Sequence, residues 1–241
     1  MTPMTTTPKI KLFLDGADRS QIIELASTSL VQGFTTNPSL MRKSGVSDYE
    51  GYCRELLALT QGKTISLEVF ADDSADMRVQ AKKIATWGRN LHVKIPVINS
   101  RGESSAPLIR ELAQEGVAMN ITAVFTIEQA YVATQALKGG PSSILSVFAG
   151  RLADAGHDPV PLIQGCARIC AEIDPNVELL WASTREAYNV LQAEQLGCRI
   201  ITAPMEVLKR VQGWGKKSPL DLSLETVRTF KADSEAAGFR L

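Results

Sequence analysis

Short apolar segments alternate with longer amphipathic segments along almost the whole chain, and this alternation is the strongest constraint on its fold. Eight segments have the length and the Val, Ile and Leu content of buried strands, and each is followed by a helical pattern. These segments span residues 10–14, 33–36, 64–69, 91–95, 117–121, 143–148, 178–182 and 199–202. Strands that alternate with helices are parallel, because each helix carries the chain back to the start of the next strand.

Eight strand–helix units in a chain of 241 residues predict an α/β fold, a single (β/α)8 TIM barrel. An open, doubly wound sheet is the alternative. That architecture usually has a glycine-rich phosphate-binding turn after its first strand. This chain has Asp15-Gly16-Ala17-Asp18 at that point, which is neither a G-x-G-x-x-G turn nor a P-loop. The closed barrel is therefore favoured.

The helical patterns also bound the domain. They are expected at residues 20–31, 48–59, 74–87, 104–114, 126–137, 159–173, 185–196 and 205–211, with an additional C-terminal helix over 222–236. Ser74 is a suitable N-cap, and Pro38 and Pro96 end the second and fourth strands. No boundary interrupts the repeat, so residues 10–241 are predicted to form one barrel domain after a flexible tail at residues 1–9.

The charge balance argues against two classes of partner. Lys and Arg number 26, as do Asp and Glu, so a groove for nucleic acid or a membrane-binding patch would have to be local. No apolar run approaches the roughly 18 residues of a spanning helix, and the N-terminus has no apolar signal core. We therefore expect a cytoplasmic protein that binds neither nucleic acid nor membrane.

The cysteines and histidines do not form a recognisable metal-site pattern. The cysteines are Cys53, Cys166, Cys170 and Cys198. Cys166 and Cys170 stand four residues apart on an expected helix, but neither His92 nor His157 completes a zinc-site spacing. Structural cysteines, no metal and no cofactor are expected.

Polar side chains stand at the carboxyl end of nearly every expected strand. Alternate residues of a strand share a face, which pairs Ser66 with Glu68, His92 with Lys94, Asn120 with Thr122, Ser146 with Phe148 and Trp181 with Ser183, while Asp15 and Asn37 follow the first two strands. Each residue alone has a structural explanation, such as a helix cap or a turn. Since barrel active sites are built at this end of the strands, the whole set predicts an active site.

Lys94 is the most informative of these residues. It lies in Val93-Lys94-Ile95-Pro96, a strand that is otherwise apolar, and lysine is rarely buried without a partner or a role. Burial disfavours an ammonium ion, and a neutral amine can attack a carbonyl to form a Schiff base. Asp15 and Glu68 are the carboxylates available to move protons. A buried Lys94–Glu68 salt bridge with a purely structural role is the alternative.

Two arginines are candidate anion ligands. Arg151 follows the sixth strand and Arg185 follows the seventh. The guanidinium fork matches phosphate oxygens, and the loops after the late strands of barrels often bind phosphate. Surface arginines without a ligand are the alternative.

Together, these residues resemble those of the transaldolase family, in its short-chain subfamily that also contains the fructose-6-phosphate aldolases. The resemblance runs from about residue 11 to residue 203 and more loosely to the last helix. Its landmarks are Phe13-Leu14-Asp15, Gly33-Phe34-Thr35-Thr36-Asn37-Pro38-Ser39, Val93-Lys94-Ile95-Pro96, Asn120-Ile121-Thr122 and Ser146-Val147-Phe148-Ala149-Gly150-Arg151. Their order and their positions at strand ends make the signal specific.

The resemblance implies roles for each matching residue. Lys94 corresponds to the Schiff-base lysine and Asp15 to the acid/base, while Glu68 and Thr122 correspond to the pair that positions a water molecule during imine formation. The implied substrate-binding residues are Thr36, Asn37, Asn120, Ser146 and Phe148 around the sugar, and Arg151, Ser183 and Arg185 around its phosphate.

The resemblance also implies an activity, transaldolase transfer of a dihydroxyacetone unit in the pentose phosphate pathway. The donor would be a ketose phosphate such as fructose 6-phosphate or sedoheptulose 7-phosphate, and the acceptor an aldose phosphate. In this family glutamate at the place of Glu68 and phenylalanine at the place of Phe148 accompany group transfer, whereas glutamine and tyrosine accompany free aldol cleavage.

Three other readings stay open. The chain could be a free aldolase of the fructose-6-phosphate type, a transaldolase acting on a sulfonated sugar, or a non-catalytic barrel that binds sugar phosphates. Short relatives tend to form ring-like oligomers, often through the C-terminal helix, so a homo-oligomer is expected. Leu222, Val227 and Phe230 could supply its apolar contacts or could pack on the chain's own barrel.

Overall fold

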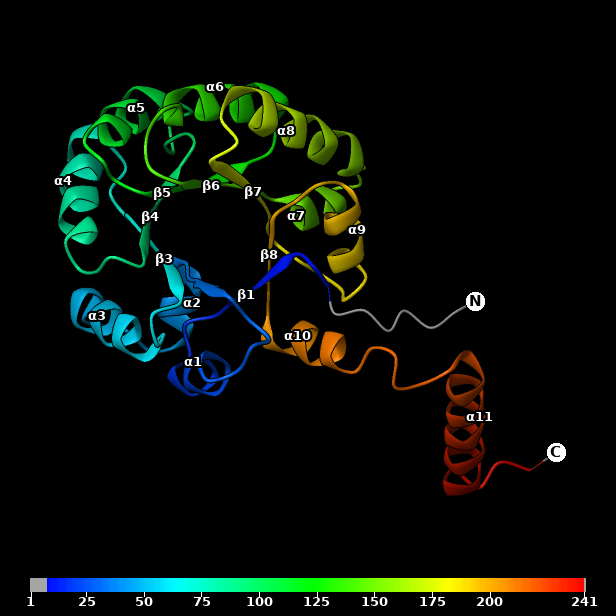
Figure 1. Ribbon diagram of the computed structural model, residues 1–241. Coiled ribbons are helices and arrows are strands. Elements are labelled where there is room, and N and C mark those ends of the chain that lie inside the picture. Colours follow the sequence, from blue (N-terminus) through cyan, green and yellow to red (C-terminus); the bar gives the residue numbers. More distant parts are fainter. Residues whose placement is uncertain (1–7, 241) are drawn as a thin grey trace.

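The computed structural model describes residues 8–240 and shows a closed barrel of parallel strands in the order β1 to β8 (Figure 1). The strands are β1 (Lys11–Asp15), β2 (Gly33–Thr35), β3 (Thr64–Glu68), β4 (Leu91–Pro96), β5 (Met119–Val124), β6 (Ser143–Val147), β7 (Val177–Trp181) and β8 (Ile200–Ala203). The predicted barrel is therefore confirmed, and β8 closes it by pairing with β1. Most of the tail predicted at residues 1–9 lies outside the described residues.

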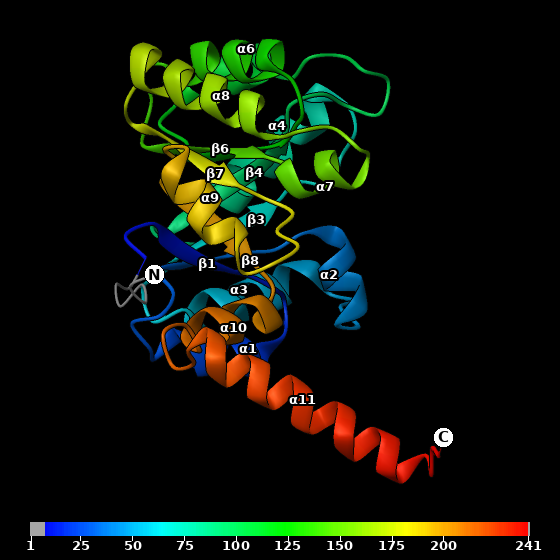
Figure 2. The same cartoon turned by 90° about the vertical axis from the view of Figure 1, so that its right-hand side faces the viewer.

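Helices surround the barrel, except for the last one, which lies apart from it (Figure 1). They are α1 (Arg19–Ala26), α2 (Pro38–Lys43), α3 (Tyr49–Leu59), α4 (Ser74–Ala85), α5 (Ala106–Gln114), α6 (Ile127–Leu137), α7 (Ala149–Asp154), α8 (Val160–Ile173), α9 (Asn189–Gln195), α10 (Met205–Gln212) and α11 (Pro219–Ala236). Most match the expected patterns, but α2 and α7 were not predicted. Both are short and lie at the same end of the barrel (Figure 2).

Local chemistry explains where sequence and structure differ. Pro38 was read only as the end of a strand, but it also begins α2, with Asn37 as the N-cap, because proline suits the first turn of a helix. Asp73, not Ser74, caps α4, since its carboxylate accepts the N–H groups of Ala75 and Asp76. The helix expected from residue 185 begins only at Asn189.

The barrel interior contains both an apolar cluster and a set of buried polar side chains. Strands β1 and β6 to β8 contribute an inner cluster that consists of Phe13, Ile144, Leu180, Ala182 and Ile200, with Phe148 packed against it. Buried polar side chains are concentrated on strands β2 to β5, namely Thr35, Ser66, Lys94, Asn120 and Thr122, and Ser146 on β6 and Thr202 on β8 join them. A much larger apolar cluster fills the layer between the strands and the helices. Most of the apolar packing therefore lies between the strands and the helices, which leaves the polar side chains inside the barrel available for chemistry.

Helix α11 differs from the others because it does not cover the barrel. It begins at a capping box formed by Ser218 and Asp221, and it extends away from the barrel beyond α10 (Figures 1 and 2). None of its residues is buried. Its exposed apolar side chains are Leu220, Leu222, Leu224, Val227 and Phe230. They do not pack on the barrel of their own chain.

Candidate active site

A cavity of about 530 Å³ opens at the carboxyl end of the strands. Every strand, or the loop directly after it, contributes at least one lining residue. Those predicted from the sequence are Asp15, Asn37, Glu68, Lys94, Thr122, Ser146, Phe148, Arg151, Ser183 and Arg185. The register of the closed barrel thus brings together side chains that are up to 170 residues apart in sequence.

Lys94 lies in the wall of this cavity and is only 6% exposed. Its Nζ donates a hydrogen bond to the carbonyl oxygen of Thr36, at 2.9 Å, and lies 3.1 Å from Oε2 of Glu68. The salt bridge considered from the sequence is therefore present. It does not close the site, because both partners line the same open cavity. The amine is thus held in place and within reach of a carbonyl group that enters the cavity.

Asp15 is the second carboxyl group of the cavity. Thr35 Oγ1 donates to its Oδ1 at 2.9 Å, and Thr202 Oγ1 lies 2.5 Å from Thr35 Oγ1. Since Thr35 gives its one proton to Asp15, Thr202 is the donor between the two hydroxyl groups. Burial raises the pKa of Asp15, and the charge of Lys94 and the hydrogen bond from Thr35 only partly oppose this rise. A carboxyl group with a raised pKa suits an acid/base role near neutral pH.

Asn120 does not line the cavity but lies directly behind it. Its Nδ2 donates to Ser66 Oγ at 3.0 Å, and its Oδ1 accepts a hydrogen bond from Ser146 Oγ at 2.7 Å. All three side chains are buried. Thr36 is also buried, and its hydroxyl group bonds to the Ser66 carbonyl rather than entering the cavity. These contacts give Asn120 and Thr36 supporting positions.

Thr122 and Asn37 approach the cavity from two sides. Thr122 Oγ1 is buried and has no hydrogen-bond partner among residues 8–240, so its hydroxyl group can still bond to a molecule in the cavity. Asn37 is half-buried at the start of α2, and its side chain accepts the N–H of Leu40. Its amide nitrogen remains available for a hydroxyl group of a ligand.

The cationic end of the cavity lies after β6 and β7. Arg185 bonds to Asp154, with Nε to Oδ2 at 2.8 Å, and Arg151 lies over the ring of Phe148 at 5.3 Å. Asn189 Oδ1 accepts the N–H groups of Arg185 and Glu186, which shapes the turn before α9. Both guanidinium groups are exposed at the cavity wall. The two guanidinium groups can therefore bind an anionic group at the mouth of the cavity while they stay hydrated.

Ser183 reaches the cavity in an unexpected way. Strict alternation along the seventh strand placed Ser183 on the face of Trp181, and this prediction was wrong. Trp181 packs in the layer under the helices, whereas Ser183 lines the cavity. The strand ends at Trp181 and Ser183 has a φ of 64°. This left-handed conformation reverses the direction of the side chain.

Some lining residues were not predicted. Thr35, Ser39, Lys43, Ala123 and Thr202 also border the cavity. Thr35 lies within the family landmark at residues 33–39 and Thr202 lies at the end of the eighth strand, so both positions carried a signal in the sequence. Lys43 belongs to the unpredicted helix α2, and no pattern in the sequence marked it.

The cysteines and His92 do not line this cavity. The four cysteines are free and buried, and burial raises the pKa of Cys170 to about 11. His92 shares its strand with Lys94 but bonds to Thr64 Oγ1 at 2.9 Å. Within residues 8–240 no group of three or more His, Cys, Asp or Glu side chains is arranged to hold a metal ion. No helix in that range combines the length and the apolar character needed to cross a membrane.

Comparison with solved structures shows the fold. A structure described as "Native KDPGal structure" superimposes with a TM-score of 0.52 and covers 99% of this chain and 100% of that chain, at 14% sequence identity. At this identity the likeness concerns the barrel alone.

Comparison of sequences is more specific. A "Probable transaldolase" of Dehalococcoides mccartyi is 37% identical over 202 residues, which cover 84% of this chain and 90% of the relative. A "Probable transaldolase" of a Thermoanaerobacter species is 34% identical over 233 residues, 96% of this chain and 100% of the relative. Residues 12–241 match the family model described as "Transaldolase/Fructose-6-phosphate aldolase". The chain therefore belongs to the transaldolase/fructose-6-phosphate aldolase family.

Proposed function

We propose that this enzyme of the aldolase/transaldolase type transfers a dihydroxyacetone unit from a ketose phosphate to an aldose phosphate through a Schiff base on Lys94. One observation carries the proposal. A buried amine lies in the wall of a cavity that also contains two carboxyl groups and two arginines. Binding alone would not require a lysine to be held there, whereas imine chemistry does.

Imine formation uses the contact between Lys94 and Glu68. Glu68 takes a proton from the ammonium, and the free amine attacks the C2 carbonyl of the ketose to give a carbinolamine. Glu68 then returns the proton, directly or through a water molecule held by Thr122, so that the hydroxyl group leaves as water and a protonated imine remains. The distance of 3.1 Å between Nζ and Oε2 suits the first transfer.

Cleavage uses Asp15. As a carboxylate, Asp15 accepts the proton of the C4 hydroxyl group, the bond between C3 and C4 breaks, and its electron pair moves into the imine to give an enamine. The aldose phosphate leaves with its new aldehyde group. The enamine carbon then attacks the aldehyde carbon of an acceptor aldose, whose carbonyl oxygen takes the proton from Asp15. Water hydrolyses the imine that re-forms and releases the ketose product from Lys94.

The polar lining matches the two ends of such a substrate. We assign Asn37 and Ser146 to the dihydroxyacetone hydroxyl groups. The phosphate is assigned to Arg151, Ser183 and Arg185, and all five residues line the cavity. A guanidinium fork binds phosphate oxygens in pairs. The presence of two arginines and one buried amine in the lining of a single cavity supports a sugar with a terminal phosphate as the substrate.

Group transfer is favoured over free aldol cleavage by Phe148. Its ring lines the cavity, packs against Phe125 at 5.5 Å between ring centroids, and has no hydroxyl group to direct water to the enamine. The enamine therefore waits for an aldehyde acceptor.

Borohydride reduction in the presence of fructose 6-phosphate tests the central step. Peptide mass spectrometry should find the three-carbon adduct on Lys94, and turnover should require an added aldose phosphate. An adduct on another lysine, or none, would remove the Schiff base from the proposal. Release of glyceraldehyde 3-phosphate at full rate without an acceptor would instead identify a free aldolase.

A further inference from the structure

Helix α3 carries two tyrosines whose hydroxyl groups reach the ends of two different barrel strands. Tyr49 Oη donates to the backbone carbonyl of Glu68 at 2.6 Å, and Tyr52 Oη donates to the backbone carbonyl of Ala17 at 2.6 Å. The residues are three apart, so both side chains leave the same face of the helix. Glu68 and Asp15, which lies two residues before Ala17, are the two carboxyl groups of the proposed mechanism.

The ring of Tyr49 is held by neighbouring aromatic side chains. It packs edge-on against Phe70 with centroids 5.3 Å apart and lies 6.4 Å from the ring of Trp87. Burial raises the pKa of Tyr49, which keeps its hydroxyl group protonated and able to donate. Glu68 is the last residue of β3. A donor fixed at its carbonyl therefore limits the movement of the backbone from which the carboxylate reaches Lys94.

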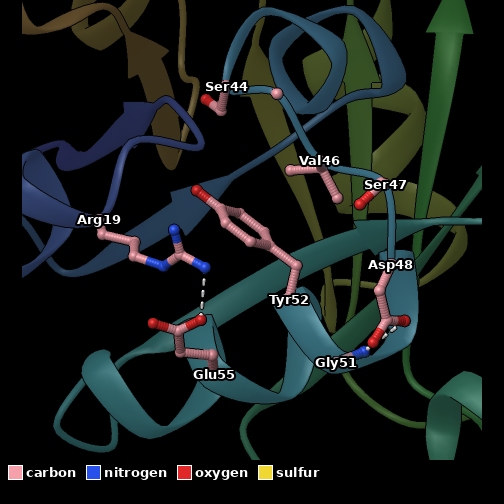
Figure 3. Close-up of a pocket in the computed structure, with 9 residues that line it drawn as sticks. Arg19, Ser44, Val46, Ser47, Asp48, Gly51, Tyr52 and Glu55 are labelled. Atoms are coloured by element: carbon pink, nitrogen blue, oxygen red, sulfur yellow. Dashed lines mark hydrogen bonds and ion pairs between the residues drawn. The ribbon is translucent and has the colours of Figure 1, made fainter.

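The ring of Tyr52 is held by Arg19, and both residues line a second cavity of about 270 Å³ (Figure 3). The guanidinium group of Arg19 lies over its ring at 4.2 Å, and Arg19 bonds to Glu55, one turn further along α3. The Tyr52 side chain is largely buried, with 7% of the residue exposed. The segment after Asp15 is thus tied twice, by Tyr52 at Ala17 and by the N–H of Gly16 at the Thr35 carbonyl, 3.0 Å away.

We infer that Tyr49 and Tyr52 are positioning residues that make α3 a common support for the two carboxyl groups, Glu68 and Asp15. The inference rests on the proposed function. Because one helix contacts the backbone at or near both carboxyl groups, it couples their positions in addition to the strand ladder. Tyr49 acts through Glu68 on imine formation, and Tyr52 acts through Asp15 on cleavage of the C3–C4 bond.

The test compares Tyr49→Phe and Tyr52→Phe with Tyr131→Phe, which controls for the loss of a tyrosine hydroxyl group elsewhere in the chain. Tyr131 lies on α6, is 51% exposed and borders neither carboxyl group. Rapid-quench borohydride trapping measures the rate of adduct formation at Lys94, and a single-turnover assay of aldose phosphate release measures cleavage. Thermal unfolding of each variant measures the fraction that is folded.

We expect Tyr49→Phe to slow adduct formation about ten-fold, and Tyr52→Phe to slow cleavage about ten-fold while adduct formation stays within about two-fold. The KM of each should change less than two-fold, because neither hydroxyl group touches the sugar. Tyr131→Phe should match the unmodified chain. If Tyr52→Phe does not fold, the Tyr49→Phe result decides the inference.

Two outcomes would overturn the inference and leave the proposed function intact. In both, the unmodified chain forms its adduct at Lys94. Either both variants keep both rates within two-fold, or both rates fall equally and in proportion to the fraction unfolded. Failure of the unmodified chain to form any adduct would instead overturn the proposed function, and this inference with it.

Discussion

Glu68 and Lys94 are register partners on the adjacent strands β3 and β4, and their side chains meet as an ion pair 3.1 Å long. The pairing follows from the parallel ladder, which places two inward-facing residues side by side at the carboxyl end of the barrel. The same register places Asn120 beside Lys94 on the next strand. The row of Glu68, Lys94 and Asn120 is therefore a direct product of strand alignment.

Removal of Lys94 should abolish activity and also reveal the cost of an unpaired carboxylate. Lys94→Met is expected to lower kcat at least 1000-fold, since no other group can form the imine. It should also destabilise the fold, because Glu68 keeps a partly buried charge without its partner. Adding Glu68→Gln should restore about 1–3 kcal/mol of unfolding free energy. Urea unfolding checks this, and a double variant no more stable than Lys94→Met would contradict it.

The buried carboxyl group of Asp15 should lower the free energy of unfolding at neutral pH. Its pKa is raised in the folded protein, so the folded state binds more protons than the unfolded state above the ordinary Asp pKa. Stability then falls as pH rises from about 4 through the folded pKa. Asp15→Asn removes this titration, and we expect a Tm about 2 °C higher at pH 7 but no gain at pH 4. The same variant should cleave the C3–C4 bond at least 100-fold more slowly. Calorimetry at the two pH values tests the effect, and an equal gain at both would contradict this origin.

Gly150 allows the segment after β6 to pack closely against the segment after β7, so that Arg151 and Arg185 border the same cavity. A Cβ at this position would lie 1.7 Å from the carbonyl oxygen of Ser183. Gly150→Ala must therefore separate the segments that carry Arg151 and Arg185, and we expect the KM for phosphorylated sugars to rise at least ten-fold. Gly213→Ala is the control, because its Cβ would meet no atom nearer than 3.2 Å. Steady-state kinetics with and without the sugar phosphate group would show whether the loss belongs to phosphate binding.

The C-terminal helix should mediate self-association. Val227 and Phe230 are 64% and 67% exposed on α11, and isolated helices with such apolar side chains rarely remain uncovered in water. We propose that a second copy of the chain covers them. Val227→Glu with Phe230→Glu is then expected to reduce the mass measured by sedimentation, while the circular dichroism of the barrel is unchanged. An unmodified chain that sediments as a monomer would disprove the proposal.

The amino-acid sequence by itself determined the number of strand–helix units, the parallel sheet and the residues at the strand ends. These properties depend on local periodicity and on the chemistry of single positions such as Lys94 in an apolar strand. They can be read without knowing which segments meet. Short patterns were weaker guides, and helices α2 and α7 went unrecognised because six residues contain less than two helical turns.

The tertiary structure alone decided how these residues meet. Closure of β8 against β1 brings Thr202 to Thr35 and thereby completes the hydrogen-bond chain to Asp15. The left-handed backbone at Ser183 turns its side chain into the cavity against the expected alternation. The two tyrosines of α3 reach strand ends that no sequence pattern connects to them. Such contacts depend on distances across the fold, and a linear pattern contains no information about distances between segments that are far apart in the chain.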